Sequence, residues 1–184
     1  MSLTPSNMLP LGTQAPKFEL INTLDDTMVN LTQAKGVKGT LIMFISNHCP
    51  FVKHVNEEIS KLAKDFVSKG ISCIAISSND VEKYPQDGPQ EMKQNAIDND
   101  FIFPYLYDQT QAVAKAYDAA CTPDFYVFDA DLVLVYRGQL DDSRPSNDIP
   151  VTGKDIRQVL QNLINEHPIS EVQKPSIGCN IKWK

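Results

Sequence analysis

The chain has 184 residues, of which 42% are hydrophobic, so it is long and apolar enough to form one domain with a substantial core. Its net charge is −6 and its acidic and basic residues are interspersed, which argues against binding to nucleic acids or anionic membranes. No apolar run approaches the length of a membrane span, and no signal segment opens the sequence, so we expect a cytoplasmic location.

The first half of the chain predicts a strand–helix–strand unit. A short strand is expected at residues 18–21. Residues 41–46 have no polar face, which indicates a central strand buried on both sides. Apolar side chains then recur at helical spacing over residues 51–67, and the helix is expected to stop at Gly70. Because residues 71–77 read as the next strand, a right-handed crossover should join two parallel strands.

The middle of the chain is less regular. Residues 79–89 predict a polar loop, which leads into a helix at residues 90–99. The segment 101–107 contains Pro104, so it is expected to be either an edge strand or irregular. A short helix is expected at residues 111–117.

The last third predicts a hairpin followed by a helix. Strands at residues 125–128 and 132–136 flank a turn and should pair antiparallel. A polar loop at residues 143–150 precedes a final amphipathic helix at 153–167. The tail, residues 168–184, has little periodicity and is expected to dock on the body of a single domain that spans residues 1–184.

Cys49 stands where the predicted central strand gives way to the helix. The unpaired N–H groups of a helix N-terminus stabilise an anion, and Pro50 suits the first helical position. This setting should favour the thiolate, which is the nucleophilic form of cysteine. His48 can add positive charge or a hydrogen-bond donor. The alternative is an inert cysteine that only fills space at a strand end.

Four cysteines are widely spaced and include no C-x-x-C pair, which argues against a zinc ribbon and a disulfide scaffold. In a reducing compartment any disulfide among them should be transient. Cys73 lies inside an apolar strand and is expected to be structural. His48 and His54 have no third ligand at metal spacing, so we expect neither a metal nor another cofactor.

The order of these elements resembles the thioredoxin fold. Residues 12–20 match the G-x-x-A-P-x-F-x-L opening of its redoxin branch, which holds AhpC/TSA-type peroxiredoxins and thiol–disulfide oxidoreductases. The motif N-H-C-P-F-V at residues 47–52 and I-G-C-N-I-K-W at residues 177–183 are similar to a group of bacterial thioredoxin-like proteins. The resemblance implies an α/β fold with a central mixed sheet flanked by helices, an N-terminal extension and an inserted helix.

The same resemblance implies a substrate site beside Cys49. Thr122 and Pro123 match the family's X-Pro loop, whose proline is cis and faces the active cysteine. Thr122 and Pro123 are therefore expected to orient the substrate, with Pro50 and Phe51 forming part of the same surface.

Two positions depart from thioredoxin. Val52 stands where thioredoxins have their second cysteine, and Met43 stands where they have a buried aspartate. A mixed disulfide on Cys49 must therefore be resolved by a distant thiol. His48 is the only obvious substitute for the missing proton acceptor.

Two cysteines are candidates for the resolving thiol. Cys121 lies near the X-Pro loop, but in an extended segment its side chain should point away from that of Thr122. Cys179 lies on the tail, which is long enough to reach almost any part of a domain of this size. We favour a Cys49–Cys179 exchange, and the alternative is that Cys179 is merely buried under a docked tail.

The expected function is a thiol-dependent oxidoreductase that exchanges disulfides with a protein or a small-molecule thiol. A peroxiredoxin-like, antioxidant peroxidase is one alternative. Ser46 matches a peroxiredoxin position, but Ile42 replaces the proline, and Arg137 is the nearest candidate for the peroxide-binding arginine. The other alternative is a binding or redox-sensing protein without enzymatic activity.

Overall fold

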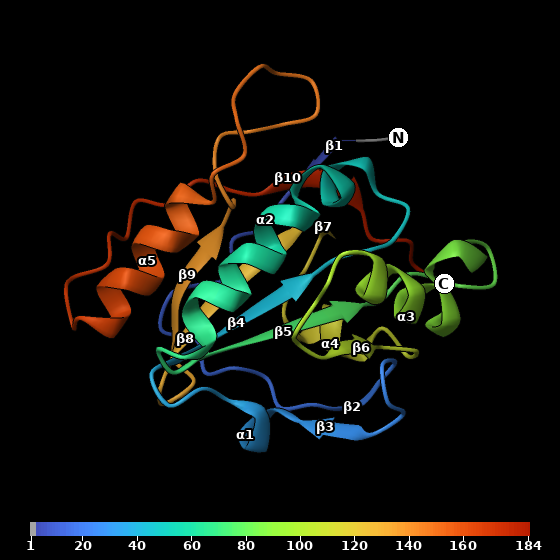
Figure 1. Cartoon of the computed structure of the whole chain (residues 1–184), viewed down its shortest axis with the longest axis horizontal. Helices are drawn as coiled ribbons and strands as arrows, with labels where there is room; N and C mark the ends of the chain where they lie inside the picture. The colour runs from blue at the N-terminus through green and yellow to red at the C-terminus, as the bar shows by residue number, and fades with distance from the viewer. Residues whose placement is uncertain (1–2) are drawn as a thin grey trace.

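A mixed sheet of seven strands forms the centre of the protein in the computed structural model, which describes residues 3–184 (Figure 1). Its strands are β2 (Glu19–Asn22), β3 (Met28–Asn30), β4 (Gly39–Phe44), β5 (Ile71–Ser77), β6 (Tyr105–Tyr107), β8 (Asp124–Asp129) and β9 (Leu134–Gly138). They stand in the order β3-β2-β6-β5-β4-β8-β9. The β4–β5 and β5–β6 pairs are parallel and the other pairs are antiparallel.

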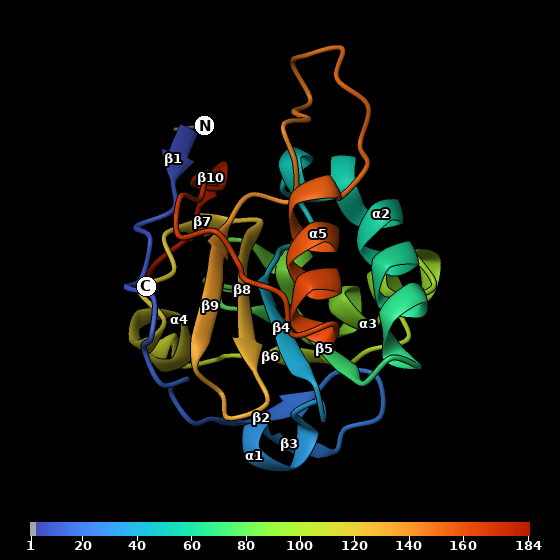
Figure 2. The ribbon, with the colours of Figure 1, turned by 90° about the vertical axis from the view of Figure 1, so that its left-hand side faces the viewer.

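A second, smaller sheet joins the two ends of the described chain. It consists of β1 (Leu3–Pro5), β10 (Ile177–Asn180) and β7 (Cys121–Thr122). β10 lies in the middle and pairs antiparallel with both neighbours. Figures 1 and 2 show the smaller sheet above the central one.

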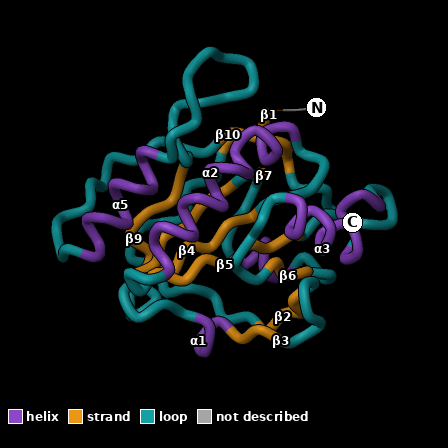
Figure 3. The backbone as a smooth tube through the Cα atoms, viewed as in Figure 1, coloured by secondary structure: helices purple, strands orange, loops and turns teal. Residues whose placement is uncertain are grey.

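Helices cover both faces of the central sheet (Figures 2 and 3). They are α1 (Leu31–Ala34), α2 (Pro50–Val67), α3 (Pro89–Asp98), α4 (Ala112–Ala116) and α5 (Lys154–Ile164), with a 3₁₀ turn, η1 (Pro85–Asp87), before α3. Buried side chains of α2, α3 and α5 belong to the core on one face, and those of α1 and α4 belong to the core on the other. Among residues 3–184, no helix is both long and apolar enough to cross a membrane.

The β4–α2–β5 unit follows directly from the sequence pattern. All six residues of β4 are buried, as expected for a strand with helices on both sides. α2 buries Val52, Val55 and Ile59 on one face and leaves the Lys61 side chain exposed on the other. β4 and β5 pair in parallel, which confirms the predicted crossover. The unit brings the start of α2 to the end of β4.

The prediction for residues 101–107 was wrong in one respect. β6 is an interior strand, because it pairs with β5 on one side and β2 on the other. Pro104 comes immediately before β6 and its carbonyl accepts a hydrogen bond from the Ala75 N–H at 3.0 Å. Because Pro104 precedes the strand, its missing N–H takes no hydrogen bond away from the β6 pairings. The strand can therefore lie inside the sheet.

The short elements were missed. β1, β3, β7, β10 and α1 have only two to four residues each, too few to show a period. The most important omission is β10, since it turns part of the supposedly irregular tail into the central strand of the smaller sheet.

Candidate active site

Cys49 is the N-cap residue of α2, and Pro50 occupies the first turn. The Cys49 carbonyl accepts hydrogen bonds from the N–H groups of Val52 and Lys53 at 3.1 and 3.0 Å. Its side chain makes no capping hydrogen bond and is completely buried. The sulfur points instead toward β7 and β10. The Cys49 sulfur therefore has no direct N–H contact with the helix terminus.

Cys179 is the partner that the structure brings to Cys49. The two Sγ atoms lie 2.9 Å apart although the residues are 130 positions apart in the sequence. Cys179 sits in β10, opposite Thr122 of β7, and is only 3% exposed. Burial, together with the adjacent Cys49 sulfur, raises the pKa of the Cys179 thiol to about 12. The structure has both residues as thiols.

The other two cysteines are placed differently. The Cys121 sulfur lies 3.7 Å from the carbonyl oxygen of Pro123, and burial raises the pKa of this thiol far above its ordinary value, with Asp124 adding to the effect. Cys73 lies in β5, where burial raises its pKa to about 12. Both thiols resist ionisation, as Cys179 does, and what distinguishes Cys179 is its sulfur–sulfur contact with Cys49.

Thr122 and Pro123 lie directly against the cysteine pair. The peptide bond between them is cis. The Thr122 carbonyl oxygen accepts a hydrogen bond from the Cys49 sulfur at 3.2 Å, and its Oγ1 lies 3.4 Å from Ser46 Oγ. The backbone of Thr122 pairs with Cys179, so β10 already covers the strand edge that was expected to orient a substrate.

Phe51 borders a small cleft. Pro123 and Ile177 line the same cleft, together with Ser143 and Arg144 from the loop that precedes α5. Figures 1 and 3 show this loop extending away from the body of the protein between β9 and α5. The cleft therefore brings Phe51, two residues after Cys49, together with Pro123 of the X-Pro loop.

His48 is held by a buried carboxylate that the sequence analysis missed. Its Nδ1 lies 2.6 Å from Oδ2 of Asp87, which is fully buried. The imidazole also stacks on Tyr84, with ring centroids 5.4 Å apart and planes within 6°. Because a carboxylate can only accept, Nδ1 carries the proton and Nε2 is left for other partners. The only sequence signal for an ordered Asp87 was the pair of prolines, Pro85 and Pro89, that brackets it.

The residues considered for peroxide or metal binding are engaged elsewhere. Arg137 Nη1 donates to Oε1 of Gln173 at 2.8 Å. His54 Nε2 lies 2.7 Å from Ser143 Oγ. Within residues 3–184 there is no cluster of three or more His, Cys, Asp or Glu side chains that is suited to a metal ion.

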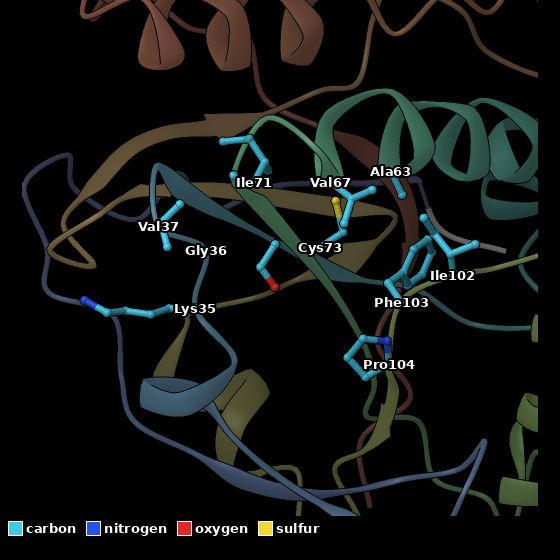
Figure 4. Close-up of a pocket in the computed structure, with 12 residues that line it drawn as sticks. Lys35, Gly36, Val37, Ala63, Val67, Ile71, Cys73, Ile102, Phe103 and Pro104 are labelled. Atoms are coloured by element: carbon cyan, nitrogen blue, oxygen red, sulfur yellow. The ribbon is translucent and has the colours of Figure 1, made fainter.

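A hollow of about 390 Å³ lies at the opposite end of the β4–β5 pair (Figure 4). Its walls include Val37, Val67, Ile102 and Phe103, and Cys73 contributes the sulfur atom seen in the figure. The hollow lies beside the first residues of β5, whereas Cys49 follows the last residues of β4. The hollow is therefore separate from the cysteine pair.

The family model described as AhpC/TSA family matches residues 11–137. The chain therefore belongs to the AhpC/TSA family, the redoxin branch of the thioredoxin-like proteins. No curated protein matches it.

Two solved structures are similar over almost the whole chain. An uncharacterized conserved protein from Geobacillus kaustophilus is 60% identical, with a TM-score of 0.98 and coverage of 100% of this chain and 97% of that one. A hypothetical protein from Sinorhizobium meliloti 1021 is 41% identical, with a TM-score of 0.96 and coverage of 98% of both chains.

The thioredoxin domain of a thiol-disulfide oxidoreductase from Bacteroides vulgatus shares the fold. It is 18% identical, with a TM-score of 0.63 and coverage of 83% of this chain and 99% of that one. The expected thioredoxin-like α/β fold is confirmed.

Proposed function

We propose that this protein is a thiol–disulfide oxidoreductase in which Cys49 is the nucleophile and Cys179 is the resolving thiol. The observation that carries the proposal is the 2.9 Å separation of the two sulfur atoms. Two cysteines of a packed domain that come into contact from distant parts of the chain are suited to form a reversible disulfide, whose S–S length is about 2.05 Å.

The reaction proceeds in two exchanges. The Cys49 thiolate attacks one sulfur of a substrate disulfide, forms a mixed disulfide and releases the other substrate sulfur as a thiolate. The Cys179 thiolate then attacks the Cys49 sulfur, which forms the Cys49–Cys179 disulfide and releases the second substrate thiol. The substrate gains two electrons and the protein loses two. A dithiol protein or two small-molecule thiols reduce the protein again, which fits the expected cytoplasmic location.

The environment of Cys179 supports this order of events. Part of the rise in its pKa comes from the neighbouring Cys49 sulfur, and Lys182 opposes that rise. When Cys49 is bound in a mixed disulfide it carries neither a proton nor a charge, so its contribution disappears. Cys179 therefore ionises more easily at the step in which it must attack.

Five further residues receive roles in this proposal. The Thr122 carbonyl orients the Cys49 sulfur, and Pro123 and Phe51 border the cleft by which substrate approaches. His48, with Nδ1 engaged by Asp87, offers Nε2 for proton transfer. Pro50 begins the helix whose positive end faces the thiolate.

Burial sets a condition on the substrate step. Cys49 is completely buried while β10 is docked, so a protein disulfide reaches it only when β10 moves away from β7. A small disulfide needs less movement. The peroxidase alternative has weaker support, because Arg137 donates to Gln173 and lies in β9.

Mild oxidation followed by peptide mapping without reduction tests the proposal. We expect a Cys49–Cys179 disulfide in the wild type and in Cys121→Ser, and mixed disulfides on Cys49 that persist in Cys179→Ser. A Cys49–Cys121 bridge, or stable adducts on Cys49 in the wild type, would reject Cys179 as the resolving thiol.

A further inference from the structure

Asp87 accepts hydrogen bonds from the backbone of the two residues that precede Cys49. Its Oδ1 accepts hydrogen bonds from the N–H groups of Asn47 and His48 at 2.8 and 3.3 Å. Its Oδ2 lies 2.6 Å from His48 Nδ1 and accepts a hydrogen bond from Asn79 Nδ2 at 2.7 Å. The carboxylate therefore holds both residues before the nucleophile by their main chain.

Asn79 connects this carboxylate to the tail. While its Nδ2 donates to Asp87, its Oδ1 accepts the N–H of Lys182 at 2.8 Å. The next residue, Asp80, donates its own N–H to the Lys182 carbonyl at 2.8 Å. Asn79 is only 4% exposed, so water does not compete for these bonds. Lys182 lies three residues after Cys179, just beyond the end of β10.

We infer that Asn79 and Asp87 are positioning residues of the thiol exchange, which hold the segment before Cys49 and the segment after Cys179 in a fixed relation. This inference rests on the proposed function. A thiol attacks a disulfide efficiently only when the reacting sulfur atoms are held close and aligned, which raises their effective concentration. The Asp87–Asn79–Lys182 chain of bonds does this in addition to the β7–β10 pairing.

The side-chain amide suits this bridge because it presents a donor and an acceptor together. An aspartate at position 79 would keep an acceptor for Lys182 but would turn a second carboxylate toward Asp87. An alanine would lose both bonds. The two substitutions therefore interrupt the same bridge at different points.

The test is the equilibrium constant of the Cys49–Cys179 disulfide in glutathione redox buffers. In this reaction one oxidised glutathione takes two electrons from the two thiols, yielding the protein disulfide and two reduced glutathiones. We expect the constant for disulfide formation to fall about tenfold in Asn79→Ala and Asn79→Asp, as the loss of a buried charge-assisted hydrogen bond implies. Asp87→Asn, which has the same shape and keeps an acceptor for the backbone, should give a smaller fall.

Asn22→Ala is the matched control. Asn22 is also buried, donates to the Asp25 carboxylate at 2.9 Å and accepts the Tyr105 N–H at 3.1 Å, so it makes the same two kinds of bond away from the cysteines. A residue that only stabilises the fold affects the dithiol and disulfide forms equally and leaves the constant unchanged. Asn22→Ala should therefore lower the stability alone.

The outcomes separate the two proposals. A wild type that forms no Cys49–Cys179 disulfide overturns the proposed function. The positioning role is overturned, and the function left intact, if the wild type forms the disulfide and the equilibrium constants of Asn79→Ala, Asn79→Asp and Asp87→Asn equal that of the wild type. Equality with the constant of Asn22→Ala has the same meaning. If Asn79→Ala does not fold, the shape-conserving Asp87→Asn decides.

Discussion

Asp124 is a carboxyl group buried immediately after the cis peptide bond. It is fully buried, and its Oδ2 accepts a hydrogen bond from the Tyr126 hydroxyl at 2.9 Å. Burial raises its pKa from 3.8 to about 7, and the hydrogen bond from Tyr126 opposes this rise only in part. The folded protein therefore retains a proton here that the unfolded chain releases at lower pH.

The pKa of Asp124 predicts a pH-dependent stability. The folded-state pKa lies above the unfolded value, so the stabilising contribution is complete below about pH 4 and is lost as the pH rises to about 7. Over this pH range the wild type should lose on the order of a few kcal/mol in its free energy of unfolding, and Asp124→Asn should not show this loss. Urea denaturation at about pH 4 and about pH 8 measures it, with the exposed Asp131→Asn as control. If Asp124→Asn keeps the wild-type dependence, the carboxyl is not the source.

At the scale of the element, β10 brings Cys179 to Cys49. The strand is anchored by Ile181, which is 1% exposed, while Trp183 is 40% exposed and has Lys115 Nζ 5.7 Å from its ring centroid. Gly178 lets the strand approach β7 closely. A Cβ atom at this position would stand 1.9 Å from the Thr122 carbonyl oxygen, which is backbone and has no freedom to turn aside.

Gly178→Ala should separate β10 from β7 and expose Cys49. We expect the rate of Cys49 alkylation by iodoacetamide to rise at least about tenfold, because a buried thiol reacts only through opened states and the lost pairing makes these about 1.4 kcal/mol or more easier to reach. Mass spectrometry of Cys49 peptides measures this rate. Val172→Ala, at a position on the same tail that is 92% exposed, should leave it close to the wild-type value. Equal rates in both variants would contradict the steric role of Gly178.

At the scale of the whole molecule, the Cys49–Cys179 pair links the first crossover to the end of the chain. The residues are 130 positions apart, so a disulfide between them closes most of the chain into one loop. Such a link removes conformational freedom from the unfolded state. For a loop of this length the chain-entropy estimate is about 5 kcal/mol of stabilisation.

The oxidised protein should therefore be clearly more stable than the reduced protein. Chemical denaturation of both forms measures the difference, with Cys179→Ser as a control that should show none. Equal midpoints for the oxidised and reduced wild type would indicate that the disulfide strains the folded state as much as it restricts the unfolded one. The same linkage means that folding favours disulfide formation.

The sequence by itself determined the parts of this protein that rest on local pattern. The unbroken apolar run of β4 and the helical spacing of α2 predicted both elements, and their junction located Cys49 at a helix start. The redoxin motifs predicted the family and the mixed sheet. The helical spacing is local because burial of one face imposes a period on the residues of a single element, and the β4 run is local because burial on both sides leaves no polar position.

Only the tertiary structure decided what surrounds Cys49. β10 has four residues and exists because β1 and β7 supply its hydrogen bonds, so its sequence carries no period. Asp87 lies in a turn whose composition predicts only a polar loop, and its role comes from the partners that Asn79 and His48 provide. Which of the distant cysteines meets Cys49 depends on the path of the whole chain. Contacts between residues far apart in sequence leave no local pattern, because the energy that forms them belongs to the packed molecule.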